Sequence, residues 1–303
     1  RKAAAHDQPG RARALGMIVG IASGKGGTGK TTVAVNLAAS LPEPVLLLDC
    51  DVEEPNCHLF LAPQVTASAR VSIPVPVLEE SKCTSCGLCS KICEYHAIAF
   101  LGDRPLIFPE LCHGCGGCHW VCPTGALTEI PNEIGVVETA TVPSGTLVQG
   151  RLHVGKALSP PLIRAVKQHA RPEGITLVDS PPGTACSLAA ALTGCDFALL
   201  VAEPTRFGQY DLSLLVDSVR ELKIPCGVLI NRSRGRDDPV RAYCREQGIP
   251  VLGEIPEREE LARAYARGRL AIQVLPELAG TLRDLWSQIT VLAGRSTSGR
   301  RRL

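Results

Sequence analysis

The sequence has few aromatic residues, little net charge and no long hydrophobic run. Phenylalanine, tryptophan and tyrosine make up 4% of its 303 residues, and methionine occurs once. The longest apolar stretch, residues 189–202, contains Asp196 and is shorter than the roughly 20 residues that a membrane-spanning helix needs. We therefore expect no stable insertion into a membrane.

The formal net charge is only +2, and the excess of positive charge lies at the two ends of the sequence. Residues 1–16 and 295–303 are basic, whereas the residues between them carry more acidic than basic side chains. A broad basic face is the electrostatic signature of nucleic-acid binding. The body of the sequence lacks that excess, so we expect no nucleic-acid partner.

The composition is that of a globular protein, with 45% hydrophobic and 20% charged residues, and the length predicts about two domains. Met17 is the single methionine, so we expect translation to start near it and residues 1–16 to lie outside the fold. We expect residues 295–303 to form a basic tail. The sequence has no convincing export signal, which favours a cytoplasmic protein.

A glycine-rich loop lies between the first predicted strand and the first predicted helix. Residues 17–22 form a short apolar run, residues 24–31 fit G-x-x-x-x-G-K-[ST], and residues 31–40 have a helical pattern. Glycines let backbone N–H groups approach phosphate oxygens at the amino end of a helix, where the dipole also favours an anion. We predict a nucleotide-phosphate site at Gly24, Gly26, Gly27, Thr28, Gly29, Lys30, Thr31 and Thr32, with Lys30 on the β- and γ-phosphates and Thr31 in the Mg²⁺ shell.

Apolar runs and helical patterns alternate through much of the remaining sequence. Strands are predicted at 45–49, 175–179, 197–201 and 227–231, and helices at 210–222, 240–247 and 276–292. This alternation predicts an α/β fold with a doubly wound, mainly parallel sheet. Sheets of this kind bind ligands beyond the carboxyl ends of their strands.

Carboxylates stand at that edge of two predicted strands. Asp49 ends the strand 45–49 and Asp51 follows two residues later, so both side chains are expected to point into the same crevice. A solvated turn is the alternative interpretation of this pair. Asp179 ends the strand 175–179, directly before a stiff Pro-Pro-Gly turn.

Fourteen cysteines are present, and eight of them fall within 40 residues. They repeat the spacing C-x2-C-x2-C-x3-C in an insert that we place at 81–130, between two parts of the ATPase-like domain at 17–80 and 131–294. In a long chain without an export signal, this clustering favours metal ligation over disulfides. The spacing is that of bacterial two-cluster ferredoxins, where the fourth cysteine of each run binds the other cluster, and a pair of zinc sites is the alternative. The predicted 4Fe-4S ligands are Cys83, Cys86, Cys89 and Cys122 for one cluster, and Cys112, Cys115, Cys118 and Cys93 for the other.

The glycine-rich loop contains an additional lysine, Lys25, and its pattern K-G-G-x-G-K-T resembles the deviant P-loop of the MinD/ParA/Mrp superfamily. With its cysteine-rich insert, the sequence closely resembles superfamily members that contain a ferredoxin domain. The resemblance implies an ATPase that binds ATP and Mg²⁺ and forms a homodimer on binding ATP. It also implies that Lys25 reaches the partner's ATP, that Asp51 orients or activates water, that Asp49 and Asp179 hold Mg²⁺ directly or through water, and that Asn231 reads adenine.

Three functions agree with these features to different degrees. The first, which we favour, is an ATPase dimer that couples nucleotide state to electron transfer through two 4Fe-4S clusters to an unidentified redox partner. The second is a carrier that delivers an iron-sulfur or related cluster to an acceptor protein, although the late C-x-x-C pair of Mrp-type scaffolds is missing after Asn231. The third is a MinD- or ParA-like positioning ATPase, which leaves eight cysteines unexplained.

Cys186 lies seven residues after Asp179, the spacing at which the similar nitrogenase iron protein carries a cluster ligand. We favour a small buried cysteine here, because no second ligand of that bridging kind is apparent. The other five cysteines outside the insert are expected to have no partner: Cys50, Cys57, Cys195, Cys226 and Cys244.

Overall fold

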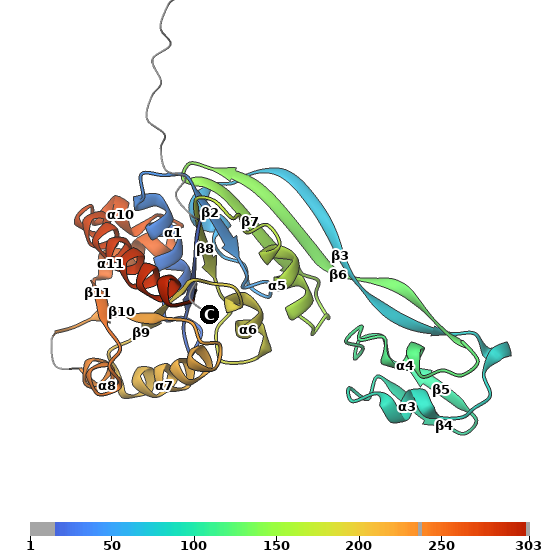
Figure 1. The fold of residues 1–303 in the computed structure, drawn as a ribbon. Helices are drawn as coiled ribbons and strands as arrows, with labels where there is room; N and C mark the ends of the chain where they lie inside the picture. The colour runs from blue at the N-terminus through green and yellow to red at the C-terminus, as the bar shows by residue number, and fades with distance from the viewer. Residues whose placement is uncertain (1–15, 236–237, 301–303) are drawn as a thin grey trace, which may run out of the picture.

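The computed structural model describes residues 16–235 and 238–300, and the side chains of Leu101 and residues 295–300 lie outside this description. A nine-stranded sheet forms its centre, in the order β11-β10-β9-β1-β8-β2-β7-β6-β3 (Figure 1). The first seven strands of this order are parallel, whereas β6 pairs antiparallel with both of its neighbours, β7 and β3. The predicted mainly parallel α/β sheet is therefore confirmed. The strands are β1 Met17–Ala22, β2 Val45–Asp49, β3 Gln64–Leu78, β6 Leu127–Val142, β7 Gly145–Leu152, β8 Ile175–Asp179, β9 Phe197–Ala202, β10 Cys226–Ser233 and β11 Val251–Pro256.

Helices cover both faces of this sheet (Figure 1). In β2, Leu46 and Leu48 pack in one hydrophobic cluster while Val45 and Leu47 pack in the other, because successive strand residues point to opposite faces. Burial on both faces explains why the central strands are continuous apolar runs. One face is covered by α5 Pro160–Lys167, α6 Cys186–Leu192, α7 Arg206–Glu221 and α8 Pro239–Gln247; the other by α1 Lys30–Ser40, α2 His58–Leu61, α9 Glu259–Ala266, α10 Ala271–Val274 and α11 Glu277–Arg300.

The two ends of the described chain extend beyond the predicted boundaries. The backbone N–H of Gly16 donates to the carbonyl of Pro172 at 3.0 Å, so this residue already lies against the body of the protein. At the other end, α11 continues to Arg300, through most of the expected basic tail. The expectations for residues 1–15 and 301–303 lie outside the described residues. None of the described helices is long and apolar enough to cross a membrane.

A two-stranded arm joins the sheet to the cysteine-rich segment. Strands β3 and β6 pair from Gln64↔Thr141 at the sheet to Leu78↔Leu127 at the far end, and Figure 1 shows them reaching well beyond the helical layers. Most residues of β3 are exposed, although apolar residues stand at every odd position from Val65 to Val77. The arm was not anticipated from the sequence, and it places the cysteine-rich segment away from the central sheet.

The segment at the end of the arm contains two similar short units. Helix α3 Leu88–Ile92 follows Gly87, and helix α4 Gly117–Trp120 follows Gly116, and both glycines have a left-handed backbone. The short 3₁₀ helix Glu80–Lys82 precedes the first unit. A hairpin of β4 Ile98–Leu101 and β5 Arg104–Ile107 lies between the two units. A small core of Cys89, Ile98, Cys118 and Leu127 holds the segment together.

Candidate functional site

The predicted phosphate-binding loop connects the end of β1 to the start of α1 at the carboxyl edge of the sheet. Gly27 and Gly29 have φ values of 75° and 98°, which non-glycine residues rarely adopt. A Cβ at Gly24 would lie 2.3 Å from the carbonyl oxygen of Asp211, so no side chain fits there. Lys30, the first residue of α1, is 6% exposed. The sequence pattern thus corresponds to a tight loop that leads into a helix, as a phosphate site requires.

The loop is held from β10 by two side chains. Asn231 donates its Nδ2 hydrogen to the carbonyl of Thr28 at 2.7 Å, and this amide nitrogen also fills the space beside Gly29. Arg232, with a φ of 55°, donates from Nη2 to the carbonyl of Gly27 at 3.3 Å. Asn231 therefore supports the loop, whereas its predicted role at adenine stays a prediction.

Lys25 is paired within its own chain. Its Nζ lies 3.1 Å from Oε2 of Glu203, whose other carboxylate oxygen accepts a hydrogen bond from Arg232 Nη1 at 2.5 Å. The Glu203 side chain is 12% exposed, and that of Lys25 is 40% exposed. Sequence analysis missed Glu203 and Arg232, although Arg232 directly follows the predicted Asn231.

Asp49, Asp51 and Asp179 approach the loop from the ends of two neighbouring strands, β2 and β8. Asp49 and Asp179 end β2 and β8, are paired in register and are both fully buried. Asp49 accepts hydrogen bonds from the backbone N–H groups of Asp51, Asn56 and Cys57. The predicted convergence of these carboxylates at the carboxyl edge is therefore present in the structure.

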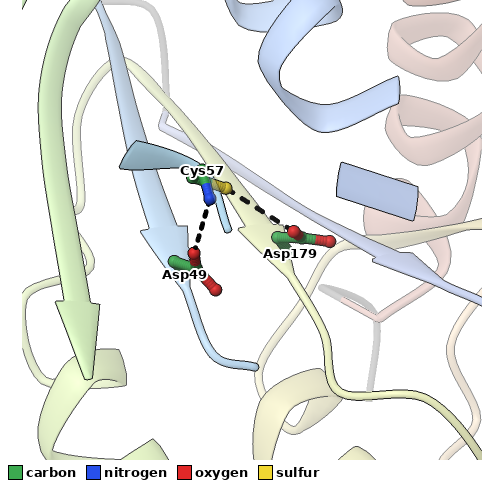
Figure 2. A group of neighbouring side chains, drawn as sticks. All are labelled: Asp49, Cys57 and Asp179. Atoms are coloured by element: carbon green, nitrogen blue, oxygen red, sulfur yellow. Dashed lines mark hydrogen bonds between the residues drawn. The ribbon is translucent and has the colours of Figure 1, made fainter. Parts of the chain in front are cut away.

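Cys57 connects the two buried carboxylates. Its backbone N–H donates to Asp49 at 3.0 Å and its thiol to Asp179 Oδ2 at 3.5 Å (Figure 2). One ligand atom from each of Asp49, Cys57 and Asp179 lies within 4.8 Å of the others. The expectation that Cys57 has no partner is wrong, and only the folding of the loop after Asp51 reveals its position.

Burial controls the protonation of this carboxylate cluster. It raises the pKa of Asp49 to about 8, assisted by the charge of Asp179. It raises the pKa of Asp51 to about 6, opposed by the charge of Lys30. Burial also raises the pKa of Asp179, opposed by a hydrogen bond from Thr31 and by Lys30. Burial is thus the largest cause of all three shifts.

The residues around Asp179 fit a magnesium ion. Its Oδ1 is buried and makes no hydrogen bond within the described part of the chain. A buried carboxylate oxygen without a partner is costly unless a cation or its water occupies the site. The hydroxyl of Thr31 and the carboxylates of Asp49 and Asp51 supply further oxygen atoms nearby, and oxygen is the donor that Mg²⁺ prefers.

The eight cysteines of the insert line two separate pockets at the end of the arm. The first pocket is open to solvent and otherwise mainly apolar. The second lies nearer the arm and includes Glu129 and His113 in its wall. The first pocket is lined by Cys83, Cys86, Cys89 and Cys122, and the second by Cys93, Cys112, Cys115 and Cys118.

The spacing of the sulfur atoms does not suit single zinc ions. Tetrahedral zinc with bonds of about 2.3 Å brings its thiolate sulfurs within roughly 3.8 Å of one another. Among the described residues, no three of the insert's cysteines have sulfurs within 4.8 Å of each other. Single zinc ions therefore do not fit these sulfur positions, whereas four thiols around one pocket are the donor set that an iron-sulfur cluster requires. The backbone N–H of Gly114 donates to the Cys112 sulfur at 3.4 Å, a contact typical of cluster sites.

The remaining cysteines lie apart from these pockets. Cys186, at the start of α6, is exposed, which contradicts the favoured interpretation of a buried cysteine. Cys195 accepts a hydrogen bond from Lys167 at 3.4 Å and so is not without a partner. Cys50, Cys195 and Cys244 are buried, and Cys226 is half-buried.

The parallel sheet, the glycine-rich loop and the converging carboxylates define a P-loop nucleotide-binding protein. Residues 19–272 match the family model described as the CobQ/CobB/MinD/ParA nucleotide binding domain. The chain therefore belongs to this family, and the predicted superfamily is confirmed.

Relatives support this assignment. An uncharacterized protein of Methanocaldococcus jannaschii is 32% identical over 221 residues, which cover 71% of this chain and 80% of that protein. The septum site-determining protein MinD of Pyrococcus horikoshii, solved with Mg-ADP, has a TM-score of 0.59 at 20% identity, with 92% of this chain and 98% of that chain covered. An iron-sulfur cluster carrier protein of Synechocystis is 44% identical over 68 residues, 20% of this chain and 19% of that protein. The MinD structure establishes likeness of fold alone.

Proposed function

We propose that this protein is an Mg²⁺-dependent ATPase that dimerises on binding ATP and couples its nucleotide state to electron transfer through two 4Fe-4S clusters. The observation that carries the proposal is the crossed arrangement of the eight cysteines. Each pocket combines three cysteines of one run with the last cysteine of the other, as the ferredoxin spacing predicts. When bound, the clusters supply one-electron redox chemistry.

The P-loop residues supply the nucleotide half of this proposal. Backbone N–H groups of the loop and Lys30 bind the phosphates, while Thr31 and Asp179 hold Mg²⁺. Asp51, two residues beyond the end of β2, orients the attacking water or accepts its proton. Lys25 stabilises negative charge on the phosphates of the partner's ATP once it leaves Glu203.

The chain itself joins the two halves. Asp51 and Cys57 lie in the loop after β2, α2 follows, and β3 then runs from the sheet to the cysteine-rich segment. A rearrangement of the loop on binding or losing the γ-phosphate is therefore transmitted into the arm, as in other nucleotide switches.

Anaerobic purification followed by iron and sulfide analysis and electron paramagnetic resonance (EPR) tests this proposal. We expect two four-iron clusters per chain, and EPR signals or partner-reduction rates that differ between ATP, ADP and no nucleotide. Fewer than two clusters in a reconstituted sample would contradict the cluster assignment. Clusters whose signals and reactivity ignore the nucleotide would contradict the coupling.

A cluster carrier is the second candidate function, favoured by the match to the Synechocystis carrier protein. It predicts transfer of intact clusters to an acceptor apoprotein, measured as loss of iron from this chain. Retention of both clusters through repeated ATP turnover would argue against it. A positioning ATPase, suggested by the MinD-like fold, would explain neither pocket.

A further inference from the structure

The two cysteine pockets differ in the charge of their walls. Besides its cysteines, the first pocket is lined by apolar residues, glycine and two threonines, without an ionisable side chain. The second pocket is lined by Glu129 and His113 in addition to its cysteines. The ring of His113 stacks on Tyr95 with centroids 3.6 Å apart. Glu129 is thus the one acidic side chain in the wall of either pocket.

Glu129 comes from the arm and not from a cysteine loop. It lies in β6, paired in register with Pro76 of β3. Its Oε1 would be 3.5 Å from a Cβ at Gly116, so the carboxylate lies against the turn between Cys115 and Cys118. Within the described part of the chain it forms no ion pair, so no cation neutralises it there.

The field of Glu129 reaches the sulfur ligands. Glu129 lines the same pocket as Cys93, Cys112, Cys115 and Cys118 and lies against the turn that follows Cys115. Its charge therefore acts on a cluster bound there, and reduction adds one negative charge to that cluster. A carboxylate close to the cluster disfavours that added charge and lowers the reduction potential.

Each pocket has one polar contact to a ligand sulfur. The Thr124 hydroxyl lies 3.8 Å from the Cys122 sulfur in the first, and the backbone N–H of Gly114 donates to the Cys112 sulfur at 3.4 Å in the second. A hydrogen bond to a ligand sulfur stabilises the reduced cluster and raises its potential. Because both pockets have such a contact, the carboxylate of Glu129 is the difference that favours unequal potentials.

We propose that Glu129 gives the two clusters unequal reduction potentials. It makes the cluster in the second pocket, which we call the arm-side pocket, the harder one to reduce. This inference rests on the proposed function, because it requires both clusters. The first electron then resides on the cluster of Cys83, Cys86, Cys89 and Cys122. The arm-side cluster, once reduced, is the stronger reductant of the pair.

The arm also makes direct contact with the second pocket. A Cβ at Gly114 would lie 3.1 Å from both Cβ of Ile73 and the carbonyl oxygen of Pro74, so the loop after Cys112 packs tightly on β3. Ile73 and Pro74 of β3 and Glu129 of β6 therefore surround the low-potential cluster, whereas only the end residues of the two strands, Leu78 and Leu127, line the first pocket. A shift of the arm would change its potential through Glu129 more than that of the distant cluster.

EPR-monitored titration of the complete cluster-loaded protein with dithionite tests the inference. We expect two midpoint potentials, and Glu129→Gln should raise the lower one while the higher one stays in place. Glu129→Asp, which keeps the charge, should retain most of the separation. Glu110→Gln is the matched control, because Glu110 is exposed and only two residues from Cys112 but lines neither pocket.

A second variant assigns the two potentials to their pockets. Thr124→Val should lower the higher potential alone. If Glu129→Gln reduces iron content, Glu129→Ala replaces it in the titration. Two clusters with no shift, an equal shift of both potentials, or a shift of the higher one would overturn this inference but leave the proposed function standing. Iron and sulfide amounting to fewer than two clusters would overturn both.

Discussion

Lys25 Nζ lies 3.1 Å from Glu203 Oε2 of the same chain, although its proposed task is at the ATP of a partner subunit. The same carboxylate also holds Arg232, whose guanidinium in turn binds the Gly27 carbonyl of the P-loop. Glu203 thus keeps the lysine folded back against its own nucleotide site. In the proposed dimer, Lys25 would exchange this pair for a contact with phosphate.

Replacing Lys25 tests its role in hydrolysis. We expect Lys25→Ala to reduce ATP turnover by at least ~100-fold, the size of effect found when one charge-stabilising donor is removed from a transition state. Nucleotide binding should change little, because Lys30 and the loop backbone remain. Turnover is measured by phosphate release and binding by calorimetry. Unchanged turnover would remove the proposed contact with the partner's ATP.

Replacing Glu203 should have the opposite effect on assembly. In Glu203→Gln the lysine no longer has a charged partner, so ATP-dependent dimers should form at a roughly two- to tenfold lower protein concentration. Analytical ultracentrifugation with a non-hydrolysable ATP analogue measures this concentration. Glu257→Gln, which breaks the ion pair with Arg234, serves as the control. If Glu203→Gln needs a higher protein concentration than the unmodified protein to form dimers, the proposed role of Glu203 is wrong.

The raised pKa of Asp49 predicts a pH-dependent stability when Mg²⁺ and nucleotide are absent. The folded-state pKa of about 8 exceeds the ordinary pKa of an aspartate, about 4, so the folded state retains a proton that the unfolded state has lost. The free energy of unfolding should therefore fall as pH rises from about 5 towards 8, by up to about 1.4 kcal/mol per pH unit. Urea denaturation at several pH values measures the slope, and Asp49→Asn should reduce it. Stability that rises over this interval would refute the assignment.

The crossed cysteine sets predict which double variants lose additional iron. Cys86→Ser and Cys122→Ser line the same pocket, so the double variant should lose no more than the one cluster that either single variant loses. Combining Cys86→Ser with Cys93→Ser should remove both clusters, although these residues belong to the same run. Iron and sulfide analysis distinguishes the two patterns. The reverse result would show that each run binds its own cluster.

Gly114 tests the contact between the arm and the second pocket. Gly114→Ala introduces a Cβ that is strained at φ 66° and crowded by Ile73 and Pro74. We expect a loss of more than ~1 kcal/mol of stability and selective loss of the arm-side cluster. Gly102 is the matched control, because it has a similar φ of 61° but open space around it. Equal effects of the two substitutions would mean that the contact contributes nothing.

Local patterns in the sequence accounted for the residues whose chemistry depends on near neighbours. The loop at residues 24–31 needs its glycines and Lys30 within one turn, so its spacing can be read directly. The cysteine runs encode their pockets in the same way. Burial on both faces makes the parallel strands continuous apolar runs, and this made the sheet predictable, as at β2.

Contacts between distant segments could not be predicted in this way. Cys57 meets Asp179 across 122 residues, and Glu203 meets Lys25 and Arg232 only because β1, β9 and β10 are neighbours in the sheet. The alternating apolar residues of β3, from Val65 to Val77, do indicate a strand, but its pairing with β6 across the whole cysteine-rich segment is a long-range contact that no local pattern encodes.

The sequence by itself determined the fold class, the phosphate loop and the two sets of four cysteines, since each depends on residue types at short, fixed spacing. Only the tertiary structure decided that Lys25 rests on Glu203, that Cys57 bridges two buried carboxylates, and that Glu129 lines just one pocket. The physical reason is that charge pairing and burial depend on distance in space, which strand order and an extended arm establish independently of any local pattern.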